Sequence, residues 1–159
     1  MLDFRIQFFD NLIGLAKKDK RIIFLTGDLG YSKFEKFRDK FPKKFINAGC
    51  IEQSMVGIAA GLALGDRKPY VYSTTPFLIF RALEQIRDDV CYQGLDVKLI
   101  GTGASQFLGF GHNLEGTENE EDILKNFPSL QRYYPRTETE LKEIMQKSYK
   151  DKRPSYIRV

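Results

Sequence analysis

The chain has 159 residues, which is typical of a single domain, and its 42% apolar content is enough to bury a substantial core. Its 25 basic and 21 acidic residues give a net charge of only +4 and mostly alternate along the chain, which argues against a nucleic-acid-binding protein. Two cysteines, Cys50 and Cys91, form neither a metal-binding nor a disulfide pattern, which suits a reducing cytoplasm. The sequence has no signal-peptide pattern and no apolar run long enough to span a membrane. We therefore expect a cytoplasmic protein that binds no membrane.

Two hydrophobic patterns alternate along the chain: apolar residues at helical spacing, and short β-branched or aromatic runs typical of buried strands. The first half predicts a helix over 4–17, a strand over 21–27, a helix over 32–41, a short strand over 44–49, a helix over 51–64 and a strand over 69–73. The second half predicts a helix over 75–93, a strand over 96–103 that leads into a glycine-rich loop over 101–116, a short helix over 119–127, a strand within 129–135, a helix over 137–150 and a strand over 154–159.

Local signals support the helix starts within this pattern. Pro76 is well tolerated in a first helical turn, and Thr137 followed by Glu140 forms a capping-box pattern. No repeat, low-complexity tract or linker marks a boundary, so 1–159 is predicted to be one domain. The regular alternation predicts an α/β fold, three-layered and doubly wound, with a mostly parallel sheet covered by helices on both faces.

The helix predicted over 51–64 combines a carboxylate in its first turn with small and apolar residues in the remainder. Gly57 and Gly61 lie in its interior, where each glycine costs about 1 kcal/mol relative to alanine. We therefore expect close approach of another backbone or a ligand, and burial on most sides of the helix. Glu52 has two interpretations: a first-turn carboxylate that complements the helix dipole, or a buried acid whose proton is controlled by its surroundings.

A long run that includes this helix, FINAGCIEQSMVGIAAGLALG, resembles the pyrimidine-binding domain of transketolase-like thiamine diphosphate enzymes. The specific core is the pattern I-E-Q-x-M-x-G-x-A-A-G-x-A, followed by PYVYS, an F-L-x-F turn and EQIRDDV. The likeness extends upstream to RIIFLTGDLG and downstream to RPSYIRV, so it covers nearly the whole chain. It implies the thiamine diphosphate-binding fold, in its pyrimidine domain.

The resemblance implies a catalytic role for Glu52. In this family a glutamate at that position hydrogen-bonds the aminopyrimidine ring of thiamine diphosphate and shares a proton with a ring nitrogen. The imino form of the cofactor then removes the proton from the thiazolium carbon, and the resulting carbanion attacks a ketose or 2-oxo acid carbonyl. A dry and rigidly held acid suits this task, which explains a glutamate at the start of a tightly packing helix.

Further site residues are implied by the same resemblance. Phe77 and Phe80 match positions that wall the aminopyrimidine, and at a spacing of three they would share one helix face if the helix is already wound there. Plain core packing is the alternative. The third wall position, often tyrosine in the family, is Leu83 here. Asp28 matches an acid near the active site and is a candidate cofactor contact, with an Asx-turn or helix cap as the alternative.

Two arginines near these wall positions have a structural and a functional interpretation. We expect Arg81 and Arg87 to form structural ion pairs with Glu84 or Asp88, rather than to reach a substrate phosphate.

The segment over 101–122 departs from the family pattern. Transketolase-like chains usually carry a histidine pair that contacts the substrate and assists proton transfer, and aligned on the E-D-I triplet that pair falls on Thr117 and Glu118. The single histidine of the chain, His112, lies beside Asn113 in the same segment. His112 is therefore a candidate catalytic residue that takes over part of that role, with an ordinary surface histidine as the alternative.

The resemblance also implies components that this sequence does not contain. The family binds magnesium and the diphosphate group through a G-D-G turn and an asparagine in a separate domain, and no such motif occurs here. We therefore expect the C-terminal subunit of a split transketolase, active with a diphosphate-binding partner chain that binds the magnesium, in a homodimer or an α2β2 heterotetramer. The implied reaction is two-carbon ketol transfer between sugars or sugar phosphates. The alternatives are a subunit of a thiamine-dependent 2-oxo acid decarboxylase and a non-catalytic scaffold.

Overall fold

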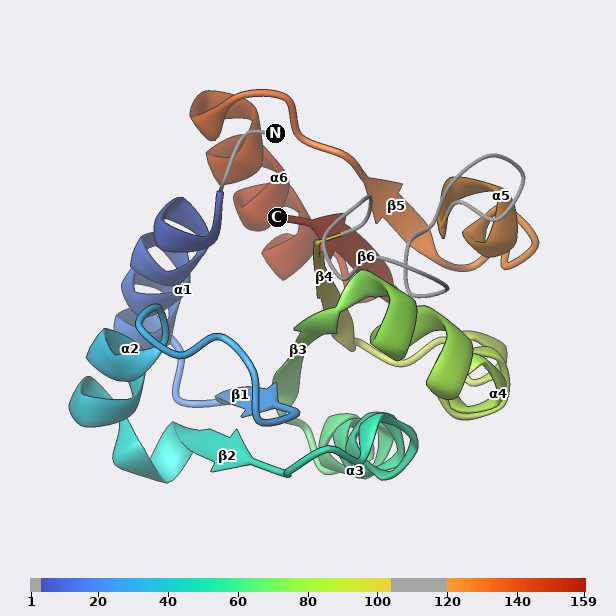
Figure 1. Cartoon of the computed structure of the whole chain (residues 1–159), viewed down its shortest axis with the longest axis horizontal. Helices are drawn as coiled ribbons and strands as arrows, with labels where there is room; N and C mark the ends of the chain where they lie inside the picture. Colours follow the sequence, from blue (N-terminus) through green and yellow to red (C-terminus); the bar gives the residue numbers. More distant parts are fainter. Residues whose placement is uncertain (1–3, 104–119) are drawn as a thin grey trace.

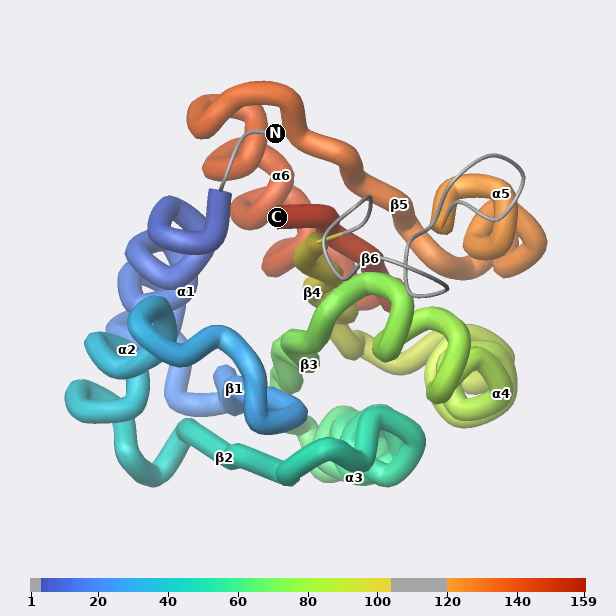
Figure 2. Tube along the Cα trace, viewed as in Figure 1, coloured from blue at the N-terminus to red at the C-terminus, as the bar shows by residue number. Residues whose placement is uncertain are grey.

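Short apolar runs form a parallel sheet in the computed structural model, which describes residues 4–103 and 120–159 (Figure 1). The described residues build six strands in the order β2-β1-β3-β4-β6-β5, and every neighbouring pair is parallel. The strands are β1 (Ile22–Thr26), β2 (Phe45–Asn47), β3 (Lys68–Thr74), β4 (Lys98–Thr102), β5 (Gln131–Tyr133) and β6 (Ser155–Arg158). The chain moves from β1 outward to β2 and then returns past β1 to β3, as Figure 2 traces. The strand order therefore reverses between β1 and β3, where ligands commonly bind at the carboxyl ends of open α/β sheets.

Helices cover both faces of the sheet, which confirms the predicted three-layer fold. One face carries α1 (Arg5–Lys18), α2 (Glu35–Lys40) and α6 (Glu138–Lys150), with the short η1 turn (Pro42–Lys44) before β2. The other face carries α3 (Glu52–Leu64), the segment η2 (Phe77–Arg81), α4 (Leu83–Gln85) and η3 (Ile86–Tyr92), and α5 (Glu120–Leu124). Within the described ranges, no helix has the length and apolar character needed to cross a membrane.

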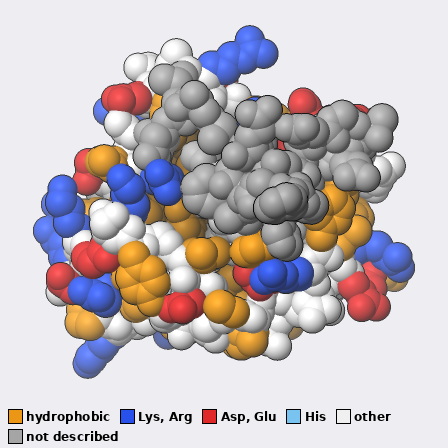
Figure 3. All heavy atoms as spheres, viewed as in Figure 1, with side chains coloured by type: hydrophobic (Ala, Val, Ile, Leu, Met, Phe, Trp, Pro, Cys, Tyr) orange, Lys and Arg blue, Asp and Glu red, His pale blue; other side chains and the backbone are white. Residues whose placement is uncertain are grey.

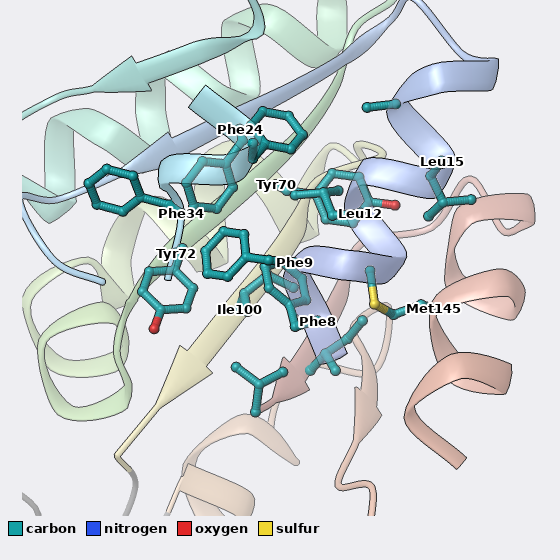
Figure 4. Close-up of a cluster of buried hydrophobic side chains, with 14 of the residues drawn as sticks. Phe8, Phe9, Leu12, Leu15, Phe24, Phe34, Tyr70, Tyr72, Ile100 and Met145 are labelled. Atoms are coloured by element: carbon teal, nitrogen blue, oxygen red, sulfur yellow. The ribbon is translucent and has the colours of Figure 1, made fainter. Parts of the chain in front are cut away.

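The alternation of side chains along the strands supplies two separate cores. On β3, Tyr70 and Tyr72 enter the core beneath α1 and α6, whereas Val71 enters the core beneath α3. Figure 4 shows the first core, in which the rings of Phe8 and Phe9 pack beside Phe24 and Tyr72. Burial of each such ring contributes about 1.5–3 kcal/mol, so both faces hold the sheet between helices.

The helix predicted over 75–93 is not a continuous α-helix. Its ends, η2 and η3, are wound as π-helix, and Ala82 interrupts the winding between η2 and α4. Four bulky apolar residues in a row cannot share one α-helical face, and here Leu78 and Ile79 are buried while Phe77 is half-buried and Phe80 is 47% exposed. Phe77 and Phe80 are thus the less buried residues of this run, and their sharing of one face stays a prediction.

The expected burial of α3 on most sides was wrong for the single chain. Met55, Val56 and Ala59 pack against the sheet, but Ile58 and Leu64 are exposed on the opposite side. A side chain added at Gly61 would meet nothing within 4 Å among the described residues. In a layered fold a helix packs on the sheet with one face only. Ala59 and Ala60 lie on that covered face, whereas Gly61 is exposed. On the face drawn in Figure 3, hydrophobic, acidic and basic side chains are interspersed.

The predicted cap of α6 is formed, and it allows a simple stability test. Thr137 accepts a hydrogen bond from the Glu140 amide, with 3.1 Å between Oγ1 and N. Thr137→Ala should lower the free energy of unfolding by about 1 kcal/mol, because one amide of the first turn loses its acceptor. Thr137→Ser keeps the hydroxyl and should stay close to the wild type. Urea denaturation measures both variants, and equal stability of the alanine variant would contradict the cap.

Candidate active site

Glu52 opens α3 and is almost completely buried, at 2% exposed. One carboxylate oxygen, Oε1, accepts a hydrogen bond from Ser73 Oγ at 3.0 Å. The other oxygen, Oε2, accepts from Arg81 Nη1 at 3.2 Å and forms an ion pair with it. Glu52 is therefore both a first-turn residue and a buried acid, and each of its oxygens has a donor. Charge-assisted hydrogen bonds of this kind hold a carboxylate in a defined orientation.

The backbone around Glu52 brings three segments together. Ser73 lies on β3 two residues after Val71, so it points toward the α3 side of the sheet. Gly27 follows β1, and a Cβ atom at this position would lie 3.3 Å from the Gly49 carbonyl oxygen and 3.4 Å from Glu52 Oε1. The absence of a side chain thus lets the end of β1 approach the carboxylate closely. Sequence reasoning missed both Gly27 and Ser73, because single small residues after or within strands carry no distinctive pattern.

Arg81 has a different partner from the acids expected from the sequence. Its partner is Glu52 rather than Glu84 or Asp88, while Arg87 does pair with Asp88, at 2.9 Å. The Arg81 guanidinium also lies over the Phe77 ring, with Cζ 3.7 Å from the ring centroid. This cation–π contact joins one of the predicted aromatic wall residues to the buried acid through a single side chain.

A pocket of about 430 Å³ adjoins this group. It is lined by Cys50, Ile51, Glu52, Gln53, Ser54, Phe80 and Arg81. Phe80, the other predicted wall residue, thus lines the same pocket as the carboxylate, whereas Leu83 packs against the core beneath α3. A buried carboxylate beside exposed aromatic surface is suited to a planar heterocycle that carries a proton on nitrogen.

Asp28 lies in the loop after β1, directly after Gly27, and its side chain is held by local partners. It accepts hydrogen bonds from the Tyr31 hydroxyl and from Asn47 Nδ2, the latter at 3.0 Å, and its own amide donates to Asn47 Oδ1. The bonds from Tyr31 and then Asn47 lower the pKa of Asp28 below its ordinary value. Its backbone is left-handed, with φ of 60°, which aspartate tolerates better than most residues. Asp28 is therefore an exposed, ionised loop acid at the same edge of the sheet as Glu52.

His112, the remaining predicted site residue, lies outside the described residues, as do Asn113, Thr117 and Glu118. Over 4–103 and 120–159, no group of three or more histidine, cysteine, aspartate or glutamate side chains is placed to hold a metal ion.

Comparison with known proteins identifies relatives along the whole chain. The family model described as transketolase, pyrimidine binding domain, matches residues 1–159. An apulose-4-phosphate transketolase subunit of Actinobacillus succinogenes is 34% identical over 128 residues, which are 80% of this chain and 41% of the relative. The 6-deoxy-6-sulfo-D-fructose transketolase subunit SqwH of a Clostridium species is 32% identical over 98% of this chain and 48% of its own length. The chain thus spans about half the length of the curated relatives it matches.

A solved structure supports the same relationship. The structure described as a split gene transketolase, inactive beta4 tetramer, superposes with a TM-score of 0.85 at 30% sequence identity. The match covers 97% of this chain and 50% of that one.

The two cysteines provide a test of the site environment. Cys50 is exposed and lines the pocket, whereas Cys91 is buried, and burial raises the pKa of its thiol to about 11. Since the thiolate is the reactive form, only about one Cys91 thiol in a thousand is ionised at pH 8. Iodoacetamide at pH 8 should therefore modify Cys50 alone in the folded chain and both residues in urea. Peptide mass spectrometry reads the sites, and rapid modification of native Cys91 would contradict this arrangement.

Proposed function

The chain belongs to the transketolase family through its pyrimidine-binding domain, and on that premise we propose that it is a subunit of a split thiamine diphosphate-dependent transketolase-like enzyme. In this proposal it contributes the aminopyrimidine-binding half of the active site and the glutamate that activates the cofactor. The reaction is two-carbon ketol transfer between sugars or sugar phosphates. The proposal is supported by relatives that are named as transketolase subunits.

The buried carboxylate of Glu52 is the observation that carries this proposal. Glu52 lines the pocket, so one oxygen can accept a hydrogen bond from a protonated ring nitrogen while Ser73 holds the other. Phe80 provides apolar surface in the same pocket, which suits the planar aminopyrimidine. When bound, thiamine diphosphate supplies the nucleophilic carbon that carries the ketol group. The protein's part is to hold Glu52 rigidly and to place the shared proton at its carboxylate.

The remaining half of the site is proposed to come from a partner chain. That chain would bind magnesium and the diphosphate, in an α2β2 heterotetramer in the cytoplasm. The outward face of α3 supports an interface, because Ile58 and Leu64 are exposed beside Gly61, where another backbone could approach closely. The non-catalytic scaffold is the second candidate, and the observation in its favour is that Thr117 and Glu118 stand where the family has its histidine pair.

Glu52→Gln separates the catalytic proposal from the scaffold. Glutamine keeps the shape but cannot hold the shared proton, so the complex with the partner chain should lose about 10²–10⁴-fold in rate. The assay is cofactor-dependent exchange of the thiazolium proton, followed by NMR, together with a melting curve that should show a folded protein. Exchange at the wild-type rate would show that Glu52 has no catalytic role.

A matched control for this variant exists on α6. Glu138 is also the first residue of its helix, but it is exposed and hydrogen-bonds Gln7. Glu138→Gln should lower the free energy of unfolding by about 0.3–1 kcal/mol through the helix dipole and leave the exchange rate unchanged.

The proposed interface is tested with a pair of exposed isoleucines. Ile58 on α3 is 43% exposed, and Ile6 on α1, on the opposite face of the sheet, is 50% exposed. Ile58→Glu should prevent assembly with a copy of the chain or with the partner, because a charge would be buried in an apolar contact. Ile6→Glu should assemble as the wild type does. Light scattering measures both, and normal assembly of the Ile58 variant would exclude this face as the interface.

A further inference from the structure

The side chain of Arg81 occupies the two contacts that a bound aminopyrimidine ring would use. Its Cζ lies 3.7 Å from the centroid of the Phe77 ring, and its Nη1 donates to Glu52 Oε2 at 3.2 Å. A guanidinium group is planar and delocalised, stacks on aromatic faces, and donates hydrogen bonds within its own plane. A protonated aminopyrimidine has the same three properties. We therefore infer that Arg81 is a placeholder: it occupies the ring site in the free protein, and the cofactor ring displaces it on binding. This inference rests on the function proposed above.

The stacking contact makes the two occupants mutually exclusive. A carboxylate oxygen can accept two hydrogen bonds, so the bond to Glu52 alone would leave room for a second donor. The face of Phe77 is different, because a separation of 3.7 Å is already van der Waals contact and leaves no space for a ring between the two groups. The aminopyrimidine can stack on that face only after the guanidinium has left it.

The surroundings of Arg81 permit such an exchange. The Arg81 side chain is 45% exposed, so water can solvate the guanidinium once it is released. Its partners among the described residues are Glu52 and Phe77. Glu52, by contrast, is buried, and its Oε2 would be left without a donor because Ser73 donates to Oε1. A ring that brings its own N–H replaces the lost bond one for one, so neither the acid nor the aromatic face is left uncovered.

The consequence is that Arg81 sets the affinity for the ring. For a ligand that binds only when a contact is vacant, the apparent Kd equals the intrinsic Kd divided by the fraction of molecules in which that contact is vacant. If Arg81 occupies the contacts about nine-tenths of the time, its removal strengthens binding about tenfold. A residue that anchored the ring would have the opposite effect when removed.

The test uses the full-length chain and the ring alone as the probe. The aminopyrimidine alcohol, 4-amino-5-hydroxymethyl-2-methylpyrimidine, is titrated into ¹⁵N- and ¹³C-labelled protein and followed by NMR. In the free protein the Arg81 side-chain resonances should be shifted by the Phe77 ring current, and saturation with the probe should return them to ordinary values. Arg81→Ala should bind the probe about tenfold more tightly than the wild type. Arg87→Ala, which removes a more exposed arginine paired with Asp88, should bind as the wild type does.

The possible outcomes separate this inference from the proposed function. Probe-induced shifts at Glu52 and Phe80 without movement of Arg81 would overturn the placeholder role and leave the ring site in place. Unchanged or weaker binding by Arg81→Ala, with a wild-type fold by NMR, would do the same. Failure of the probe to bind the wild type and Arg81→Ala alike would overturn the proposed ring site and the inference together.

Discussion

The burial of one carboxylate, that of Glu52, determines what its neighbourhood must provide. A carboxylate removed from water needs hydrogen-bond donors, because an unpaired buried charge is strongly destabilising. The two donors, Ser73 and Arg81, come from β3 and from η2, while Glu52 itself begins α3. These segments meet only when α3 and η2 are packed on the same face of the sheet. The arrangement around Glu52 therefore depends on the packing of this whole face of the sheet.

The parallel sheet supplies the precision that this arrangement needs. Side chains alternate between faces along β3, so Tyr72 enters one core while Val71 and Ser73 point to the other side. A slip of one residue in the pairing of β3 would turn Ser73 away from Glu52 and bury the tyrosines on the wrong face. The large aromatic core beneath α1 thus protects the register on which a small hydroxyl group depends. The reversal of strand order beside β1 leaves the site accessible at the edge of this rigid layer.

The sequence predicted the architecture well because hydrophobic periodicity and the order of helices and strands each depend on many residues at once. Alternating helical and strand patterns were sufficient for the three layers, and the family motif located Glu52 at the start of α3. The contacts of Arg81 were not predictable, because the expected partners were acids close in sequence and the actual partner, Glu52, lies 29 residues away. Gly27 allows close approach to Glu52 because it has no side chain, and Ser73 offers Glu52 a hydroxyl group. Both contacts join segments that are distant in the sequence, so no local pattern predicts them. The exposed face of α3 was not predictable, because the amino-acid composition of a helix does not show which of its faces the sheet covers.

The exposed face of α3 has a consequence for the steady-state level of this protein in a cell. In the single chain, apolar surface is exposed to water at Ile51, Ile58 and Leu64. Chaperones and proteases act on exposed apolar surface and on transiently opened chains, so copies whose α3 remains uncovered are the preferred substrates of cellular quality control. Copies whose α3 is covered escape that selection. If the interface proposed for α3 forms, the steady-state level of the chain would follow the supply of the partner that covers α3.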